Sequence, residues 1–249
     1  MRRLPPVPPP EALLCEACGY VLSADGQTPP PPACPECGEP AANSQPARRD
    51  GPPWARRMSP GSFARTVWGL ARGPTRFFGR LRPDADALPP RLFLLTVATL
   101  VGCGWAAAER WLLGRPPVLA LGFGMAAGHA VIALTFLEVL GVTLFSRLRG
   151  WRVPARLAEK VACYASPGWL LGAAAALGAE AVALEGGLGR TLARLTGDPL
   201  LGVRLEPAAI ALTALLAVLP FELCVHRGVR AVRFANGRSQ EPARGATAP

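Results

Sequence analysis

The sequence predicts an all-α integral membrane domain of four transmembrane helices, preceded by a small, β-rich zinc ribbon. Only 18% of the 249 residues are charged and the mean hydropathy is +0.25. In a typical soluble domain, about a quarter of the residues are charged. Four long apolar segments follow residue 91, and two Cys-x-x-Cys pairs precede it. This hydrophobicity excludes a chain that is disordered throughout. Long uncharged stretches also do not suit a nucleic-acid-binding globule, despite the net charge of +10.

The predicted zinc ribbon occupies residues 11–40. Cys15 and Cys18 form one pair, and Cys34 and Cys37 form the other. Two such pairs, brought together by a hairpin, supply the four thiolates of a tetrahedral zinc site. Glycine follows the second cysteine of each pair, where a positive φ lets the chain turn back over the sulfurs. We expect one structural Zn²⁺, because a closed site of four thiolates leaves no open position for catalysis.

The charge of the ribbon favours a protein as its partner. Residues 11–40 contain five acidic residues and no Arg or Lys. Such a module would be repelled by phosphate, so nucleic acid is disfavoured as a ligand. The arginines between residues 48 and 82 keep nucleic-acid binding as a third hypothesis.

Two segments connect the ribbon to the first apolar segment. Residues 41–60 are rich in Pro, Ala and Arg, and we expect a solvated, semi-extended linker. In residues 61–82, apolar side chains recur at three- and four-residue steps with arginines between them, which predicts an amphipathic helix in the inner headgroup layer. Gly73-Pro74 is expected to break it into two short helices. The alternative is a solvated basic linker with scattered aromatic residues.

The transmembrane domain is expected over residues 91–227. Each apolar segment is close to or above the ~20 residues that cross a hydrocarbon core as a helix. Prolines precede the second, third and fourth segments, where helix starts tolerate them. The expected spans are about 92–113, 118–145, 161–184 and 207–226. Residues 228–249 are expected to form a basic, mostly disordered cytoplasmic tail.

The distribution of basic residues predicts the topology. Arg and Lys number 12 before residue 92, five in residues 146–160 and five after residue 226, against five in the two other connections. The positive-inside rule then places both termini in the cytoplasm, where thiols stay reduced. Residues 1–10 lack the apolar core of a secretory signal. We therefore expect a multi-pass protein of the cell (inner) membrane, with the lipid bilayer as its surroundings.

Ionisable residues inside the predicted spans are candidates for function, because each costs about 2.5–3.5 kcal/mol at mid-bilayer. His129 lies near the middle of the second span, and Glu138 follows nine residues later. Glu222 and His226 lie one turn apart near the cytoplasmic end of the fourth span. Glu138 and Glu222 have similar predicted depths and could share a proton or a cation. In the structural alternative, Glu222 and His226 reach water, and His129 bonds a carbonyl of a neighbouring helix.

Small residues recur every four positions in the second and third spans, and this spacing lets helix backbones approach closely. The pattern predicts that these two spans are neighbours, or that one of them forms a homo-oligomer contact. The residues concerned are Ala120, Gly124 and Gly128 in the second span, and Gly168, Gly172 and Ala176 in the third.

Two passages resemble known proteins. Cys-Glu-Ala-Cys-Gly-Tyr at 15–20, with Cys-Pro-Glu-Cys-Gly at 34–38, resembles the N-terminal zinc ribbons of uncharacterised bacterial membrane proteins. Gly-Pro-Thr-Arg-Phe-Phe at 73–78 and Tyr-Ala-Ser-Pro at 164–167 are similar to segments of the bacterial branch of the Yip family of polytopic membrane proteins. The resemblance implies an α-helical bacterial membrane protein without established chemistry. No catalytic residue carries over from it.

Three functional hypotheses follow. The leading one is a non-enzymatic inner-membrane protein whose cytoplasmic zinc ribbon docks a protein partner or acts as a scaffold. The second is a small transporter or membrane-embedded enzyme that uses Glu138 with Glu222 and His129. Nucleic-acid binding is the third. The sequence contains no nucleophile–base signature, phosphate loop or HExxH motif, so no catalytic residue is assigned.

Overall fold

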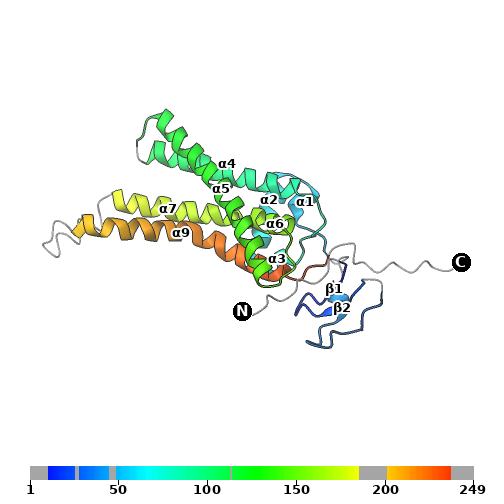
Figure 1. Ribbon diagram of the computed structural model, residues 1–249. Helices are drawn as coiled ribbons and strands as arrows, with labels where there is room; N and C mark the ends of the chain where they lie inside the picture. The colour runs from blue at the N-terminus through cyan, green and yellow to red at the C-terminus, as the bar shows by residue number, and fades with distance from the viewer. Residues whose placement is uncertain (1–10, 26–27, 45–48, 113, 185–200, 237–249) are drawn as a thin grey trace. The chain divides into compact units, whose positions relative to one another are not determined.

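The computed structural model describes residues 11–25, 28–44, 49–112, 114–184 and 201–236 (Figure 1), with the side chains of residues 179–184 and 201–212 left aside. The chain divides into two compact units. Unit 1 comprises Met1–Phe93, Thr135–Tyr164 and Val225–Pro249, and unit 2 comprises Leu94–Leu134 and Ala165–Cys224. Each unit is built from segments that are distant in the sequence.

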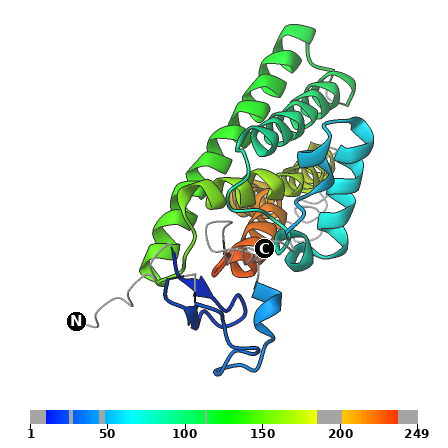
Figure 2. The same cartoon turned by 90° about the vertical axis from the view of Figure 1, so that its right-hand side faces the viewer.

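The N-terminal part of unit 1 is a small module with little regular structure (Figure 2). Strand β1 (Leu13–Leu14) pairs antiparallel with β2 (Val21–Ser23), and the 3-10 helix η1 (Ala41–Ser44) closes the module. Its core consists of five side chains, two of which are cysteines. These buried residues are Leu13, Cys15, Leu22, Cys34 and Ala41.

Three short helices follow in unit 1: α1 (Pro53–Arg56), α2 (Pro60–Arg72) and α3 (Pro74–Phe78). Ser59 caps α2, because its Oγ accepts the N–H of Ser62 while the Ser62 Oγ accepts the N–H of Ser59. The expected break at Gly73-Pro74 is confirmed, since α2 ends at Arg72 and α3 starts at Pro74.

The apolar stripe of residues 61–82 packs inside unit 1, which differs from the expected burial in lipid headgroups. Leu70, Phe77, Phe78 and Leu81 are buried, and the Phe77 ring lies 6.0 Å from that of Tyr164 in α6 (Ala155–Ala165). Protein side chains therefore cover part of the apolar face that the sequence predicts to lie in the headgroup layer, while Phe63 and Val67 are half-buried.

The expectation of a solvated linker over residues 41–60 is wrong for its described part. Trp54 is buried, and its ring makes an edge-to-face contact with the ring of Phe93. Its Nε1–H donates to the carbonyl of Pro89. The side chain of Arg49 is also buried and donates to the carbonyl of Leu81. The proline-rich composition did not reveal that this segment contains η1 and α1, or that one tryptophan and one arginine anchor it.

Unit 2 contains two close helix pairs, which Figures 1 and 2 show side by side. In α4 (Leu88–Trp111) and α5 (Pro117–Leu148), a Cβ on Gly124 would lie 2.5 Å from the carbonyl oxygen of Gly102. In α7 (Pro167–Leu184) and α9 (Leu201–Val232), a Cβ on Gly172 would lie 1.8 Å from the carbonyl oxygen of Ala217. Only glycine permits either approach.

The glycines of the small-residue pattern have helix partners that the sequence did not predict. The small residues of the second predicted span pack on α4, and those of the third pack on α9. Residues of α5 and α7, with Ala176 among them, line one cavity, which agrees with the expectation that the second and third spans are neighbours. Both glycine faces contact another helix of the same chain.

Two described helices, α4 and α5, are long and apolar enough to cross a membrane, and a third candidate is the pair α6–α7. Leu137 and Leu140 of α5 are 65% and 70% exposed, which suits side chains that face lipid rather than water. The fourth expected span, 207–226, falls within α9, and its side chains before residue 213 lie outside the described part.

The third expected span is not one continuous helix. Helix α6 ends at Ala165, α7 starts at Pro167, and their axes differ by 43°. Proline lacks the N–H that would continue the helix and disfavours helical backbone in the residue before it. Residues 161–165 thus belong to α6, whose Leu157, Val161 and Cys163 are fully buried.

The tail that the sequence predicts to be disordered was expected from residue 228, but ordered structure continues beyond that residue. Helix α9 continues to Val232, and Ala235 and Asn236 are buried. The remainder of the predicted tail, residues 237–249, lies outside the described residues.

Candidate metal centre

The two Cys-x-x-Cys pairs form nearly identical turns. The N–H of Gly19 donates to the carbonyl of Cys15 at 2.8 Å, and that of Gly38 to the carbonyl of Cys34 at 2.9 Å. Gly19 and Gly38 have φ of 86° and 73°, a region that favours glycine. The predicted role of both glycines is thereby confirmed. Each turn presents its two sulfurs to the same point.

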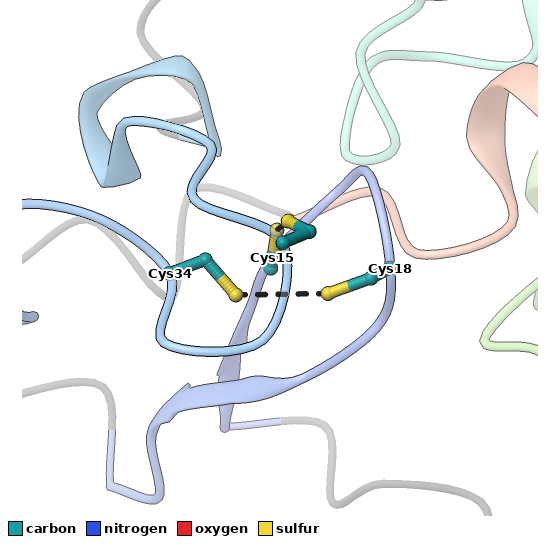
Figure 3. Close-up of side chains that lie close together, drawn as sticks. Cys15, Cys18 and Cys34 are labelled. Carbon is teal, nitrogen blue, oxygen red and sulfur yellow. Dashed lines mark hydrogen bonds between the residues drawn. The ribbon is translucent and has the colours of Figure 1, made fainter.

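The four sulfur atoms lie within 4.8 Å of one another (Figure 3). Cys15 Sγ lies 3.6 Å from Cys37 Sγ, and Cys18 Sγ lies 3.6 Å from Cys34 Sγ. Sulfurs bound to one zinc ion at about 2.3 Å would lie about 3.8 Å apart, the edge of the tetrahedron. Both distances are far from the ~2.05 Å of a disulfide. The cluster fits a four-coordinate metal ion, and zinc is the ion that such a thiolate set prefers.

Burial differs between the sulfurs of each pair. Cys15 and Cys34 are buried, whereas Cys18 and Cys37 are exposed. Burial raises the pKa of the Cys34 thiol, but hydrogen bonds from the backbone N–H groups of Cys37 and Glu36 outweigh it and bring the pKa to about 7. These amides would equally stabilise a metal-bound thiolate.

Each Cys-x-x-Cys turn with its glycine is called a knuckle here: the first is Cys15–Gly19 and the second is Cys34–Gly38. The first knuckle is fastened to the C-terminal end of unit 1 by Asn236, which is 0% exposed. Its Oδ1 accepts the N–H of Leu14 at 3.0 Å, and its Nδ2 donates to the carbonyls of Leu14 and Ser44, each at 2.8 Å. The backbone N–H of Asn236 donates to Glu16 Oε1 at 3.0 Å. One side chain thus extends the edge of β1 and closes η1 on it.

Two arginines complete this contact. Arg152 donates to the carbonyl of Ala12 at 2.6 Å and to Oδ1 of Asn236. Arg49 forms an ion pair with Glu16, with only 3% of its side chain exposed. Burial raises the pKa of Glu16, an effect opposed by Arg49, and burial lowers the pKa of Arg152 to about 10. The module therefore rests on a buried polar network.

An aromatic contact supports the same knuckle. A Cβ on Gly19 would lie 2.6 Å from the ring of Phe234. Gly19 is therefore required twice, for its positive φ and for the space that the ring occupies. No described residue covers the second knuckle (Cys34–Gly38) in this way, because Pro35 and Glu36 are exposed and a Cβ on Gly38 would meet nothing within 4 Å.

The intramembrane candidates are not brought together as one described site. His129 is exposed, and its Nδ1 bonds the carbonyl of Met125 at 2.8 Å, in its own helix rather than in a neighbouring one. Glu138 and Glu222 are half-buried, and His226 is exposed. Glu138 belongs to unit 1 and Glu222 to unit 2, so their pairing stays a prediction. Among the described residues, only the four cysteines form a group of three or more metal-ligating side chains.

The sequence did not identify the residues that fasten the module. Asn236 lies 222 positions from Leu14, in a stretch whose composition predicted disorder. Arg49 and Arg152 were counted only as positive charges that set the topology. The one local signal was Glu16 inside the first Cys-x-x-Cys pair, where an acidic residue that needs a cationic partner could have been suspected.

Comparisons with known proteins give no relative. No protein family, curated protein or solved structure matches the chain.

Proposed function

We propose that the chain is a non-enzymatic, four-span protein of the bacterial inner membrane with both termini in the cytoplasm. A structural Zn²⁺ held by Cys15, Cys18, Cys34 and Cys37 folds its N-terminal module, which serves as a protein-interaction or scaffold module at the membrane. The proposed metal ion would contribute cohesion, since the small β1–β2 sheet alone offers few apolar contacts.

The observation that carries this proposal is the unequal use of the two knuckles. The first knuckle is covered by Asn236 and Phe234, whereas Pro35, Glu36 and Cys37 of the second are exposed. The second knuckle is therefore the surface available to a partner. Its Glu36 and the absence of basic residues in 11–40 favour a protein over nucleic acid.

The module is presented as a rigid surface, not on a flexible tether. The buried contacts of Arg49 and Trp54 within unit 1 restrain the segment expected to set its reach. A partner would meet a fixed surface, which lowers the conformational cost of binding.

The test is site-specific photo-crosslinking in native membranes. A photoreactive residue at Glu36 should trap a defined protein, whereas one at Ala24, exposed in the same module, should not. Cys34→Ser should lose the crosslink while the helical domain still inserts. Identical products at both positions, or full retention in Cys34→Ser, would contradict the proposal.

A further inference from the structure

A cavity of about 350 Å³ lies within unit 1, away from the cysteine cluster. It is lined by α1, by residues 81–90 ahead of and at the start of α4, and by one face of α6. Basic and acidic side chains both reach it. They include Arg56, Lys160, Asp50, Asp84 and Asp86.

The α6 wall carries two polar groups that the described residues leave incompletely bonded. Lys160 is 2% exposed, and its Nζ donates to the carbonyls of Arg82 and Pro83 at 3.0 and 2.6 Å. None of the ion pairs among the described residues includes Lys160. An ammonium has three N–H donors, so one remains for a ligand, and a buried charge is stabilised when an opposite charge contacts it.

Tyr164 is the second group. It lies one helical turn after Lys160, lines the same cavity and is 2% exposed. Its hydroxyl is buried and has no hydrogen-bond partner in the part of the chain that the structure describes. A buried hydroxyl without a partner costs about 1–3 kcal/mol. An anionic oxygen could accept from both Tyr164 and Lys160.

The acidic side chains indicate what the rest of the ligand carries. Asp84 and Asp86 are exposed and attract the Lys160 ammonium through space. A simple anion would gain from Lys160 but would be repelled by these carboxylates. A zwitterion avoids this conflict, because its own cation would lie beside the aspartates.

We propose that this cavity binds a phosphoethanolamine group, with its phosphate at Lys160 and Tyr164 and its ammonium at Asp86. The group could belong to a phospholipid or to a soluble phosphate ester. Pro89 and Pro90 line the cavity just before the first predicted span. The inference does not depend on what the N-terminal module binds.

The chain offers a matched pair of probes, because Tyr20 and Tyr164 are its only tyrosines. The full chain is labelled with 3-fluorotyrosine in detergent, and Tyr20→Phe assigns the two ¹⁹F resonances. Glycerophosphoethanolamine and phosphatidylethanolamine are then titrated separately, with phosphatidylglycerol as the lipid that lacks an ammonium. A saturable shift of the Tyr164 resonance, without one at Tyr20, supports the proposal.

The titrations distinguish the source of the group. A shift with the soluble ester assigns the site to soluble phosphate esters, and a shift with phosphatidylethanolamine alone assigns it to the lipid. An equal response to phosphatidylglycerol, or no response to any of the three, would overturn the proposal.

Variants provide a second measurement, the retention of phosphatidylethanolamine or the soluble ester by native mass spectrometry. Tyr164→Phe removes only the unbonded hydroxyl and should lower the affinity roughly fivefold to tenfold. Asp86→Asn should weaken binding by a similar factor, while Tyr20→Phe should leave it unchanged. Unaltered binding by both Tyr164→Phe and Asp86→Asn would rule the site out, even if Lys160 variants fail to fold.

Discussion

Asn236 bonds both backbone polar groups of Leu14: its Oδ1 accepts the N–H at 3.0 Å, and its Nδ2 donates to the carbonyl at 2.8 Å. A side-chain amide thereby acts as one more residue of a β-ladder on the edge of β1. The consequence is that the segment after the last helix and the segment before the first cysteine fold as one unit. Asn236 thereby joins the N-terminal module to the last helix of unit 1.

Asn236→Ala should release the module. The substitution leaves the buried polar groups of Leu14, Ser44 and Arg152 without this partner, and we expect a loss of about 3 kcal/mol. Hydrogen exchange should show faster exchange at Leu13 and Leu14. Asn43→Ala is the control, because Asn43 is exposed in the same module. Unchanged protection in Asn236→Ala would show that the zinc site alone holds the module.

The sulfur cluster should bind one zinc ion per chain. Removal of the metal with a chelator should unfold residues 11–44 and leave the helical signal nearly unchanged, because the module contains no α-helix. Metal analysis and circular dichroism measure the two effects. Cys34→Ser should lose zinc, whereas Cys103→Ser should retain it. Zinc retained by Cys34→Ser would refute the assignment of that ligand.

Zinc binding should weaken on acidification. Protons compete with the metal for the thiolates. The pKa of Cys34 is lowered to about 7, so this thiol stays deprotonated to a lower pH than an ordinary cysteine. A competition assay from pH 8 to pH 6 should show a steep fall in affinity; a flat profile would contradict thiolate ligation.

The ion pair between Glu16 and Arg49 should stabilise the fold only as a pair. Glu16→Gln keeps an acceptor for the N–H of Asn236 but leaves the buried guanidinium without its carboxylate, at a cost of about 3 kcal/mol. Arg49→Met should cost a comparable amount. The double variant should be less destabilised than the sum of the two. Strict additivity in thermal unfolding would show that the two side chains do not interact.

A side chain introduced at Gly124 should disrupt the close contact between α4 and α5. Gly124→Leu places a Cβ 2.5 Å from the carbonyl oxygen of Gly102, so the helices must separate. Gly122→Leu, two residues earlier, is the control because a Cβ there meets nothing within 4 Å. We expect Gly124→Leu to lose thermal stability in detergent by several degrees and Gly122→Leu to match the parent protein. Equal stability of both variants would exclude this packing.

The features predicted correctly from the sequence are those encoded by short-range patterns. Cys-x-x-Cys spacing identified the sulfur cluster, Gly73-Pro74 identified a helix break, and apolar length identified α4 and α5. The glycine contacts of α5 with α4 and of α7 with α9 were not predicted, because small residues at four-residue steps show that a helix packs closely without showing against which helix. The same limit hid Asn236 and Trp54, whose partners are distant in the sequence.

The bend at Ser166 makes the number of spans a decisive measurement. If α6–α7 and α9 both cross the bilayer, a phosphatase reporter should be active outside the cytoplasm when fused after residues 114 or 190, and inactive after residue 150. A fluorescent protein at the C-terminus should then be fluorescent, as expected for a cytoplasmic end. If α6–α7 is instead a re-entrant loop, the reporter after residue 190 becomes inactive and the C-terminal fusion becomes dark. The second result would reduce the four predicted spans to three and place the C-terminus outside, away from a reduced cysteine cluster to which Asn236 binds it. Because Asn236 and Leu14 must share one compartment, we expect the first result.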